Sequence, residues 1–155
     1  CIRDRARVEC QVNRITYADS VPVTTLAKKI CDFKQSFTQY GGSRPFGTAL
    51  LIGGVDDDGI HLFETDPSGA YQSYHAGGIG SGRSTVCDFF ESNWKKNMTL
   101  NAAIKLGLEA LRTSLDSELN REAVEIAIVD KDGYRTLNRE DVNKNIDKLK
   151  PLDND

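Results

Sequence analysis

The fold class that the sequence predicts is α+β, with pairs of helices flanking antiparallel strands. Apolar residues recur at helical spacing in two pairs of segments and in one final segment, and strand-like runs lie between them. The predicted strands follow one another through short turns, which is typical of antiparallel pairing. The predicted order is helix–helix, three strands, helix–helix, two strands and helix, without an internal repeat or a linker. Residues 1–155 are therefore expected to form a single domain.

Two helices are predicted at the start of the chain. The first covers residues 1–18, where apolar side chains loosely follow helical spacing, and Pro22 separates it from the second. The second carries one apolar stripe at i, i+4, i+7 and i+11, formed by Leu26, Ile30, Phe33 and Phe37. Gly41 and Gly42 are expected to end it, because glycine tolerates the left-handed backbone of a helix terminus.

Three strands are predicted next. Residues 48–55 form a continuous apolar run, which is typical of a strand buried on both faces. A turn at 56–59 leads to a strand over 60–65, in which Ile60 and Leu62 alternate with polar residues. A second turn at 66–69 contains Pro67 and Gly69, and a third strand covers 70–76. The three strands should form an antiparallel meander.

The second half repeats the alternation of helices and strands. A glycine-rich stretch at 77–82 leads to a helix with Val86, Phe89 and Phe90. Thr99 is a predicted N-cap for a helix whose apolar stripe is Ile104, Leu108, Leu111 and Leu115. Residues 124–129 and 134–137 are predicted strands around a turn. Asn138 with Asp141 resembles a capping box for a last helix that carries Val142, Ile146 and Leu149 and stops before Pro151.

The composition excludes several classes of function. The net charge of −3 gives no electrostatic reason to expect a nucleic acid or an anionic membrane as partner. No stretch approaches the roughly 18 apolar residues that a membrane span requires. The four cysteines, Cys1, Cys10, Cys31 and Cys87, form no Cys-x-x-Cys pair and have no neighbouring histidine. We therefore expect free thiols in a reducing cytosol rather than a metal site.

Several segments, in order along nearly the whole chain, are similar to one known family. They are Asp4–Glu9, Phe37–Gly47, Phe63–Gly69, Ile79–Arg83 and Met98–Leu100 with the helix that follows. Together they resemble the α-type subunits of the 20S proteasome, especially the archaeal kind. Each motif alone is weak, whereas the ordered set is specific.

The resemblance implies a four-layer αββα sandwich of the N-terminal nucleophile hydrolase type, built on antiparallel sheets. In that family an extension, a short helix and the opening strands precede the helix that begins this sequence. Five predicted strands supply one sheet or parts of two, but not both sheets of the sandwich. We therefore expect that the N-terminal strands are missing and that this sequence is the C-terminal part of such a subunit.

The resemblance also implies a function through assembly. A proteasome α subunit joins other α subunits in a seven-membered ring, which stacks on a ring of β subunits in the cytoplasm. The ring templates the β subunits, docks a regulatory ATPase or activator, and controls entry of unfolded polypeptides for degradation. Residues 1–41 correspond to the helices that this family turns toward the β ring. The proteolytic threonine belongs to the β type, so this chain is expected to be non-catalytic.

Cys1 supports an alternative hypothesis, an active hydrolase whose N-terminal thiol is the nucleophile and whose own amine is the base. Such a nucleophile begins a strand, whereas the residues after Cys1 are predicted as helix. A second alternative is a monomeric binding module that holds a phosphate-bearing ligand on the backbone of Gly78–Gly82. The loop lacks the G-x-G-x-x-G fingerprint and a parallel βαβ unit, so a tight turn is the preferred interpretation.

Other polar residues are predicted to have structural roles. Asp56, Asp57 and Asp58 with Gly59 lack the glutamate of a calcium loop and are predicted as a solvated turn. Asp66 is interpreted as a turn former rather than as an acid–base partner of Glu64. His61 and His75 have no nucleophile near them in the sequence, and Trp94 is expected to pack. Arg44 is expected to support its loop. No catalytic, cofactor-binding or metal-binding residue is predicted.

Overall fold

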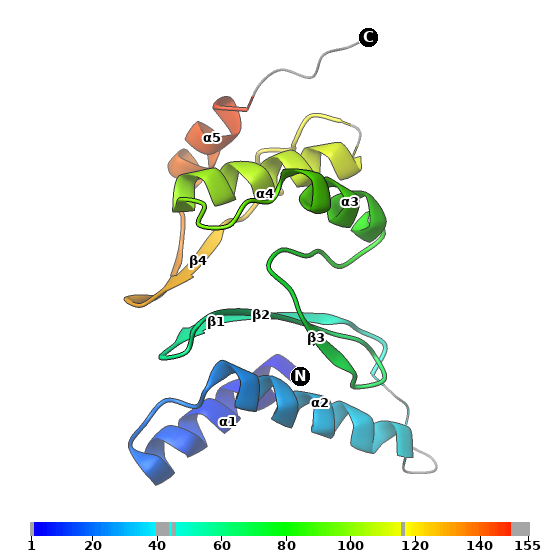
Figure 1. Cartoon of the computed structure of the whole chain (residues 1–155), viewed down its shortest axis with the longest axis vertical. Coiled ribbons are helices and arrows are strands. Elements are labelled where there is room, and N and C mark those ends of the chain that lie inside the picture. Colours follow the sequence, from blue (N-terminus) through cyan, green and yellow to red (C-terminus); the bar gives the residue numbers. More distant parts are fainter. Residues whose placement is uncertain (1, 40–43, 45, 116, 150–155) are drawn as a thin grey trace. The chain divides into compact units, whose positions relative to one another are not determined.

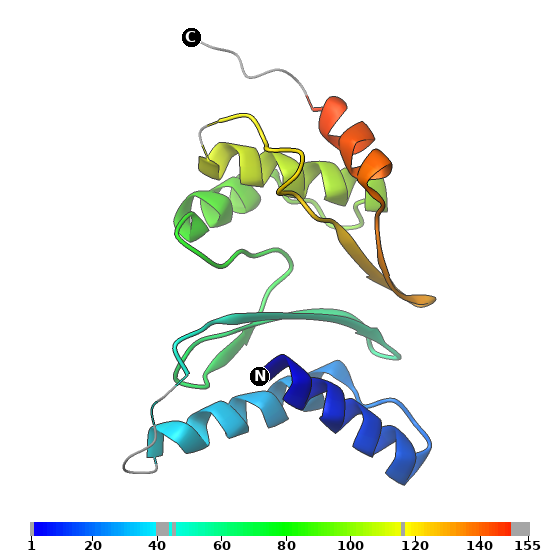
Figure 2. The ribbon, with the colours of Figure 1, turned by 180° about the vertical axis from the view of Figure 1, so that it is seen from behind.

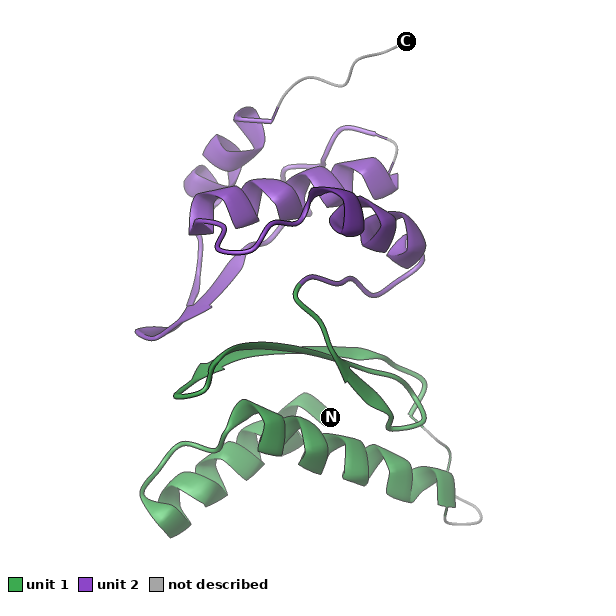
Figure 3. Cartoon of the chain, in the orientation of Figure 1, with its two compact units in different colours: residues 1–75 green, residues 76–155 purple. Residues whose placement is uncertain are grey.

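The computed structural model describes residues 2–39, 44, 46–115 and 117–149, and it divides into two compact units (Figure 3). Unit 1 comprises residues 1–75 and unit 2 residues 76–155. The predicted order of elements is confirmed in both units. That all of them form a single domain stays a prediction. No helix among the described residues is both long enough and apolar enough to cross a membrane.

Unit 1 is a helix pair on one face of a three-stranded sheet (Figures 1 and 2). The helices are α1 (Ile2–Tyr17) and α2 (Val23–Gln39), and the strands are β1 (Leu50–Asp56), β2 (Gly59–Thr65) and β3 (Tyr71–Ser73). The strands pair antiparallel in the order β1-β2-β3, as the short turns predict. The predicted end of α2 at Gly41 and Gly42 lies outside the described residues.

Helix α2 forms the contact with the sheet. Its buried side chains include Val23 and Ala27, which pack with Phe63 of β2 and the partly buried Ile52 of β1. Contact between β1 and the start of α2 is close, because a Cβ atom on Gly54 would lie 2.5 Å from Cγ2 of Val23. The side chain of Asp56 at the end of β1 accepts a hydrogen bond from the backbone N–H of Val23 at 2.9 Å. The hairpin therefore caps the first turn of the helix.

The expected burial of β1 on both faces is wrong. Leu51 remains 38% exposed, and Ile60 on the paired strand is 87% exposed. Within unit 1 the helices cover only one face, so the side chains on the other face have no covering layer. The alternation predicted in β2 also places the wrong face inward. The face with Phe63 and Thr65 is buried, whereas Ile60 on the other face is exposed.

Unit 2 contains three helices and a hairpin. They are α3 (Arg83–Asn93), α4 (Leu100–Leu115), β4 (Ala127–Asp130), β5 (Gly133–Thr136) and α5 (Arg139–Asp147). Its core joins α4 to α5 through Leu108, Leu119, Val142 and Ile146. Both predicted caps are confirmed: the backbone N–H of Ala102 donates to Oγ1 of Thr99 at 3.3 Å, and that of Asp141 donates to Oδ1 of Asn138 at 2.8 Å.

The apolar stripe predicted on α4 is buried only in part. Leu108 is buried, whereas Leu111 and Leu115 are 45% and 58% exposed. The other buried residues of α4 are Leu106 and Ala110, which lie outside the predicted stripe. The reason is that α3 and α5 both contact α4, so its buried surface is wider than one stripe.

The stability that the Asp56 cap provides should depend on pH. The N–H of Val23, with a further contribution from His61, holds the pKa of the Asp56 carboxyl below its usual range. The contribution of a carboxylate with a lowered pKa is complete above about pH 4 and is lost as the pH falls through the lower value in the folded state. We therefore expect Asp56→Ala to lower the melting temperature at pH 7, and the gap to the parent chain to narrow below about pH 4.

Thermal unfolding followed by circular dichroism between about pH 2.5 and pH 7 measures this gap. Asp57→Ala is the matched control, because Asp57 is the exposed neighbour in the same turn. A gap that stays constant over this range would contradict the assignment of the cap to the charged carboxylate.

Candidate interaction surface on the first helix

A lysine lies at the centre of unit 1. Lys34 on α2 is 0% exposed, and its Nζ donates to Oγ1 of Thr65 at 2.9 Å and to the backbone oxygen of Thr48 at 3.0 Å. Burial lowers the pKa of Lys34. A lysine beside a hydroxyl is a pair that enzymes use to activate a nucleophile. Thr65 is also 0% exposed, however, so no substrate reaches this pair and its role is to join α2 to the sheet.

The thiols of Cys10 and Cys31 are poorly suited to act as nucleophiles. Cys31 is buried, and desolvation raises its pKa. Desolvation likewise raises the pKa of Cys10 on α1. A raised pKa lowers the fraction of thiolate, which is the nucleophilic form. Cys1, the residue of the alternative hydrolase hypothesis, lies outside the described residues.

The structure gives Asp66 a structural role in the second turn. Asp66 accepts hydrogen bonds from Oγ of Ser68 at 2.6 Å and from the backbone N–H of Ala70 at 3.0 Å. These bonds, that of Ser68 first, lower the pKa of Asp66, so the carboxyl is a poor proton donor near pH 7. The interpretation of Asp66 as a turn former is confirmed. Glu64 lies on β2, opposite Leu51 and Gln72 on the neighbouring strands.

One aspartate of the first turn is paired with a histidine. Oδ1 of Asp56 lies 2.9 Å from Nε2 of His61, whose ring stacks on Phe63. Asp57 and Asp58 are exposed in the two-residue turn. His75 is exposed beyond β3. In the part of the chain that the structure describes, no three His, Cys, Asp or Glu side chains gather in a way that could hold a metal ion.

The glycine-rich loop is a packed turn. A Cβ atom on Gly78 would lie 2.9 Å from Cγ1 of Val86, and one on Gly82 would lie 3.0 Å from Cβ of Ser114. Gly80 has φ +112°, which suits glycine. Gly78 and Gly82 are thus explained by close packing against α3 and α4, and phosphate binding is not needed to account for them.

Two further residues that the sequence singled out, Trp94 and Arg44, lie outside the helices and strands. Trp94 follows α3, is half-buried, and its backbone N–H donates to the oxygen of Phe90 at 2.8 Å. Arg44 is exposed, and its neighbours on both sides lie outside the described residues. The support role of Arg44 stays a prediction.

The feature with the character of a binding surface is the outer face of α1. Val8, Val12 and Ile15 follow one another at i, i+4 and i+7 and are 55%, 53% and 84% exposed. Residues at this spacing share one face of a helix. Among the described elements, α1 is in contact with α2 alone, so no second described element packs on this helix. We call these three residues the α1 stripe.

The flank of α1 next to the stripe is held on α2. Glu9 forms ion pairs with Arg5 at 3.2 Å and with Lys29 of α2 at 3.2 Å. The guanidinium of Arg5 lies 4.9 Å from the ring centre of Phe33, which extends the contact between the helices. These contacts fix the rotation of α1, and in that rotation Val8, Val12 and Ile15 remain more than half exposed.

Comparison with known proteins decides the family. A family model described as proteasome subunit matches residues 1–129. The chain belongs to this family. It is 46% identical over 148 residues to the proteasome subunit alpha of Methanosarcina acetivorans and 47% identical over 146 residues to that of Methanopyrus kandleri. It is also 47% identical over 150 residues to the proteasome subunit alpha of Methanothermobacter thermautotrophicus.

These matches cover 94% to 96% of the chain but only 59% to 60% of each relative. The chain thus spans about three fifths of the length of the curated relatives that it matches. The resemblance read from the ordered motifs is confirmed at the level of the α-type proteasome subunit. The structure confirms antiparallel sheets with helices, which is the coarser part of the predicted fold.

Proposed function

We propose that this proteasome-family chain is a non-catalytic α-ring component of the 20S core, and that the α1 stripe is its contact with a β-type subunit. The observation that carries the proposal is the exposed stripe on a helix that has no second neighbour in unit 1. Monomeric surfaces rarely leave large apolar side chains grouped in this way. The similarity to archaeal α subunits makes ring assembly the function to which such a surface belongs.

The wider role follows from this assembly. In the proposed complex, seven α subunits form a ring that templates β subunits and admits unfolded polypeptide in the cytoplasm. A regulatory ATPase or another activator docks on that ring. The chain itself cuts no peptide bond, since the proteolytic residue is assigned to the β type.

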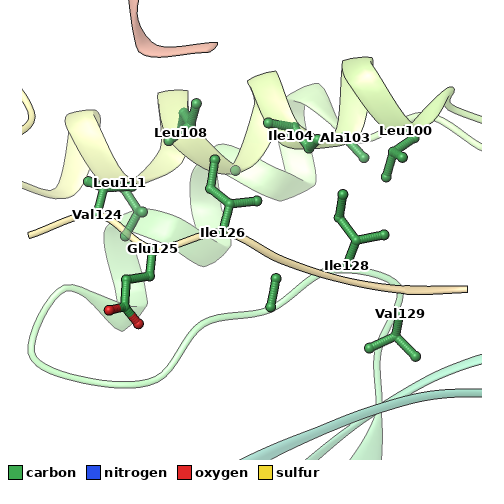
Figure 4. Close-up of a pocket in the computed structure, with 12 residues that line it drawn as sticks. Leu100, Ala103, Ile104, Leu108, Leu111, Val124, Glu125, Ile126, Ile128 and Val129 are labelled. Atoms are coloured by element: carbon green, nitrogen blue, oxygen red, sulfur yellow. The ribbon is translucent and has the colours of Figure 1, made fainter. Parts of the chain in front are cut away.

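We also propose that the two sheets belong to a four-layer αββα sandwich. Two features support this. The uncovered face of β1 and β2 carries the exposed Leu51 and Ile60. In unit 2, an apolar groove of about 390 Å³ runs between α4 and residues 124–129, with Ile104, Leu108 and Ile126 among its lining (Figure 4). β4 pairs only with β5 in the described sheet, so its other edge is open beside the groove. Further strands of a longer chain would fill both places.

Native mass spectrometry of the chain with a proteasome β-type subunit from the same source tests the assembly. We expect complexes that contain both subunits, with α copies in multiples of seven. The double variant Val8→Asp with Val12→Asp should weaken association about 100-fold, because two apolar contacts are lost and two carboxylates would be desolvated.

Tyr134→Asp is the matched control for that variant. Tyr134 is 71% exposed on β5, outside the α1 stripe, and its replacement should leave the complex unchanged. A parent chain that stays monomeric with the β subunit, or a double variant that binds like the parent, would refute the proposed contact.

A further inference from the structure

The tip of the β1–β2 hairpin contains an aspartate that is followed by a glycine. Asp58 is exposed, and a Cβ atom on Gly59 would meet nothing within 4 Å, so the bond between them has room around it. A hydrogen bond at the tip, from the backbone N–H of Asp58 to Oδ1 of Asp56 at 3.1 Å, is itself exposed. Exposed tips of this kind open locally at little cost in free energy. The Asp58–Gly59 bond therefore has access to conformations other than that of the closed turn.

An Asp-Gly bond with this freedom can rearrange without an enzyme. The backbone nitrogen of Gly59 attacks Cγ of the protonated Asp58 carboxyl, and the hydroxyl group leaves as water with the proton of the nitrogen. Water then opens the resulting succinimide at its main-chain carbonyl carbon. The chain afterwards runs through Cγ, and the former main-chain carboxyl becomes the side group. One water is released and one is taken up, so no oxidant or reductant is needed. Glycine favours the step, because it has no side chain to hinder its nitrogen and few limits on φ and ψ.

The same turn holds the start of α2. Oδ2 of the Asp56 carboxylate accepts the backbone N–H of Val23 at 2.9 Å, and Oδ1 lies 2.9 Å from Nε2 of His61. Asp56 and Gly59 are paired at the end of the closed hairpin. Isoaspartate at position 58 would add one methylene group to the main chain between these two residues. The pairing would have to shift, and the carboxylate that caps α2 lies beside the change.

We propose that the Asp58–Gly59 bond is a site of spontaneous isomerisation to isoaspartate, and that this modification releases the cap on α2. The site is independent of the proposed subunit contact, which lies on α1. A second such bond, Asp132–Gly133 in the β4–β5 turn, also has an exposed aspartate and a glycine with positive φ. There the carboxylate of Asp130 accepts from the N–H of Asp132 and from the guanidinium of Arg135, both in its own hairpin. Isomerisation at Asp132 should therefore leave the cap on α2 intact.

The test ages the whole 155-residue chain in neutral buffer at physiological temperature for several weeks. Isoaspartate is then located by peptide mapping and by labelling with a protein L-isoaspartate methyltransferase and a labelled methyl donor. We expect label at Asp58 and Asp132 but not at Asp57, which shares the first turn but is followed by a residue with a side chain. The isomerised chain should melt about 3 °C lower than the fresh chain, which is the loss expected when a helix cap is removed.

Asp58→Glu and Asp132→Glu are the matched variants. Each keeps the negative charge, and the longer side chain would have to close a larger ring, which is much slower. Asp58→Glu should keep its melting temperature on ageing, whereas Asp132→Glu should lose stability as the parent does. Aged Asp56→Ala should lose much less than the parent, because its cap is already absent.

Three outcomes would overturn the proposal. Absence of isoaspartate at position 58 in the aged parent would refute the modification site. An isomerised parent whose melting temperature is unchanged would refute the link between this turn and the cap. An equal loss on ageing in the Asp56→Ala chain would refute the same link.

Discussion

Gly69→Ala is expected to lower the free energy of unfolding by about 3 kcal/mol, a large effect for the addition of one methyl group. Gly69 has φ +93°, a region that residues with a Cβ atom rarely adopt. The added Cβ would lie 2.7 Å from the backbone oxygen of Cys31 and 2.9 Å from the backbone nitrogen of Gln35. Both atoms belong to the backbone of α2, which cannot yield by rotating a side chain. Chemical denaturation followed by circular dichroism measures the loss.

Gly59→Ala separates the cost of the backbone conformation from the cost of the steric contact. Gly59 has φ +128°, but a Cβ atom there would meet nothing within 4 Å. That variant should therefore lose only the cost of the backbone conformation, about 1 kcal/mol. Equal losses at the two positions would mean that the contact between the turn and α2 is not close in solution.

Lys34→Met is expected to lower the free energy of unfolding by about 2 kcal/mol. Methionine fills a similar volume, but the oxygens of Thr48 and Thr65 lose their donor. A buried acceptor without a donor no longer recovers the free energy that it lost on leaving water. Removing the buried charge of Lys34 is favourable, but it offsets only part of this loss. Adding Thr65→Val removes one orphaned oxygen, so the double variant should lose less than the sum of the single changes.

Lys28→Met is the control for this series, since Lys28 is an exposed lysine of the same helix and its replacement should change stability by less than about 0.5 kcal/mol. The pH dependence gives a second readout. Because burial lowers the pKa of Lys34, the unfolded chain binds this proton more tightly than the folded chain. The parent should gain stability relative to Lys34→Met as the pH rises through the folded-state pKa. A Lys34→Met chain as stable as the parent would contradict the role of the amine as a joint between α2 and the sheet.

The order and type of the elements could be predicted because each depends on a local signal. The stripe of Leu26, Ile30 and Phe37 predicted α2, and Thr99 and Asn138 predicted the starts of α4 and α5. The turn at Asp66 was equally predictable, because its bonds join residues within four positions of one another.

Burial was less predictable, since it depends on which layer covers an element. Ile60 and Leu111 have the spacing of core residues and are nevertheless exposed. Lys34 shows the reverse. Its position between Ile30 and Phe37 on the apolar stripe was a sign in the sequence that this lysine could be buried. Its partners could not be read in the same way, because Thr48 and Thr65 lie 14 and 31 positions away. The sequence assigned subunit contacts to residues 1–41 only through the family resemblance. The proposed contact within that range depends on the exposure of Val8, Val12 and Ile15, which could not be read from the sequence.

The cap on α2 has a consequence for the order in which unit 1 forms. The carboxylate that satisfies the first turn of this helix comes from Asp56, 33 positions further along the chain. Until the β1–β2 hairpin has closed, the N–H of Val23 has no such acceptor, and an isolated segment of this length is only marginally helical in water. The start of α2 and the hairpin should therefore be consolidated in the same kinetic step. The rate of that step would be limited by the search that brings two distant segments together rather than by winding of the helix.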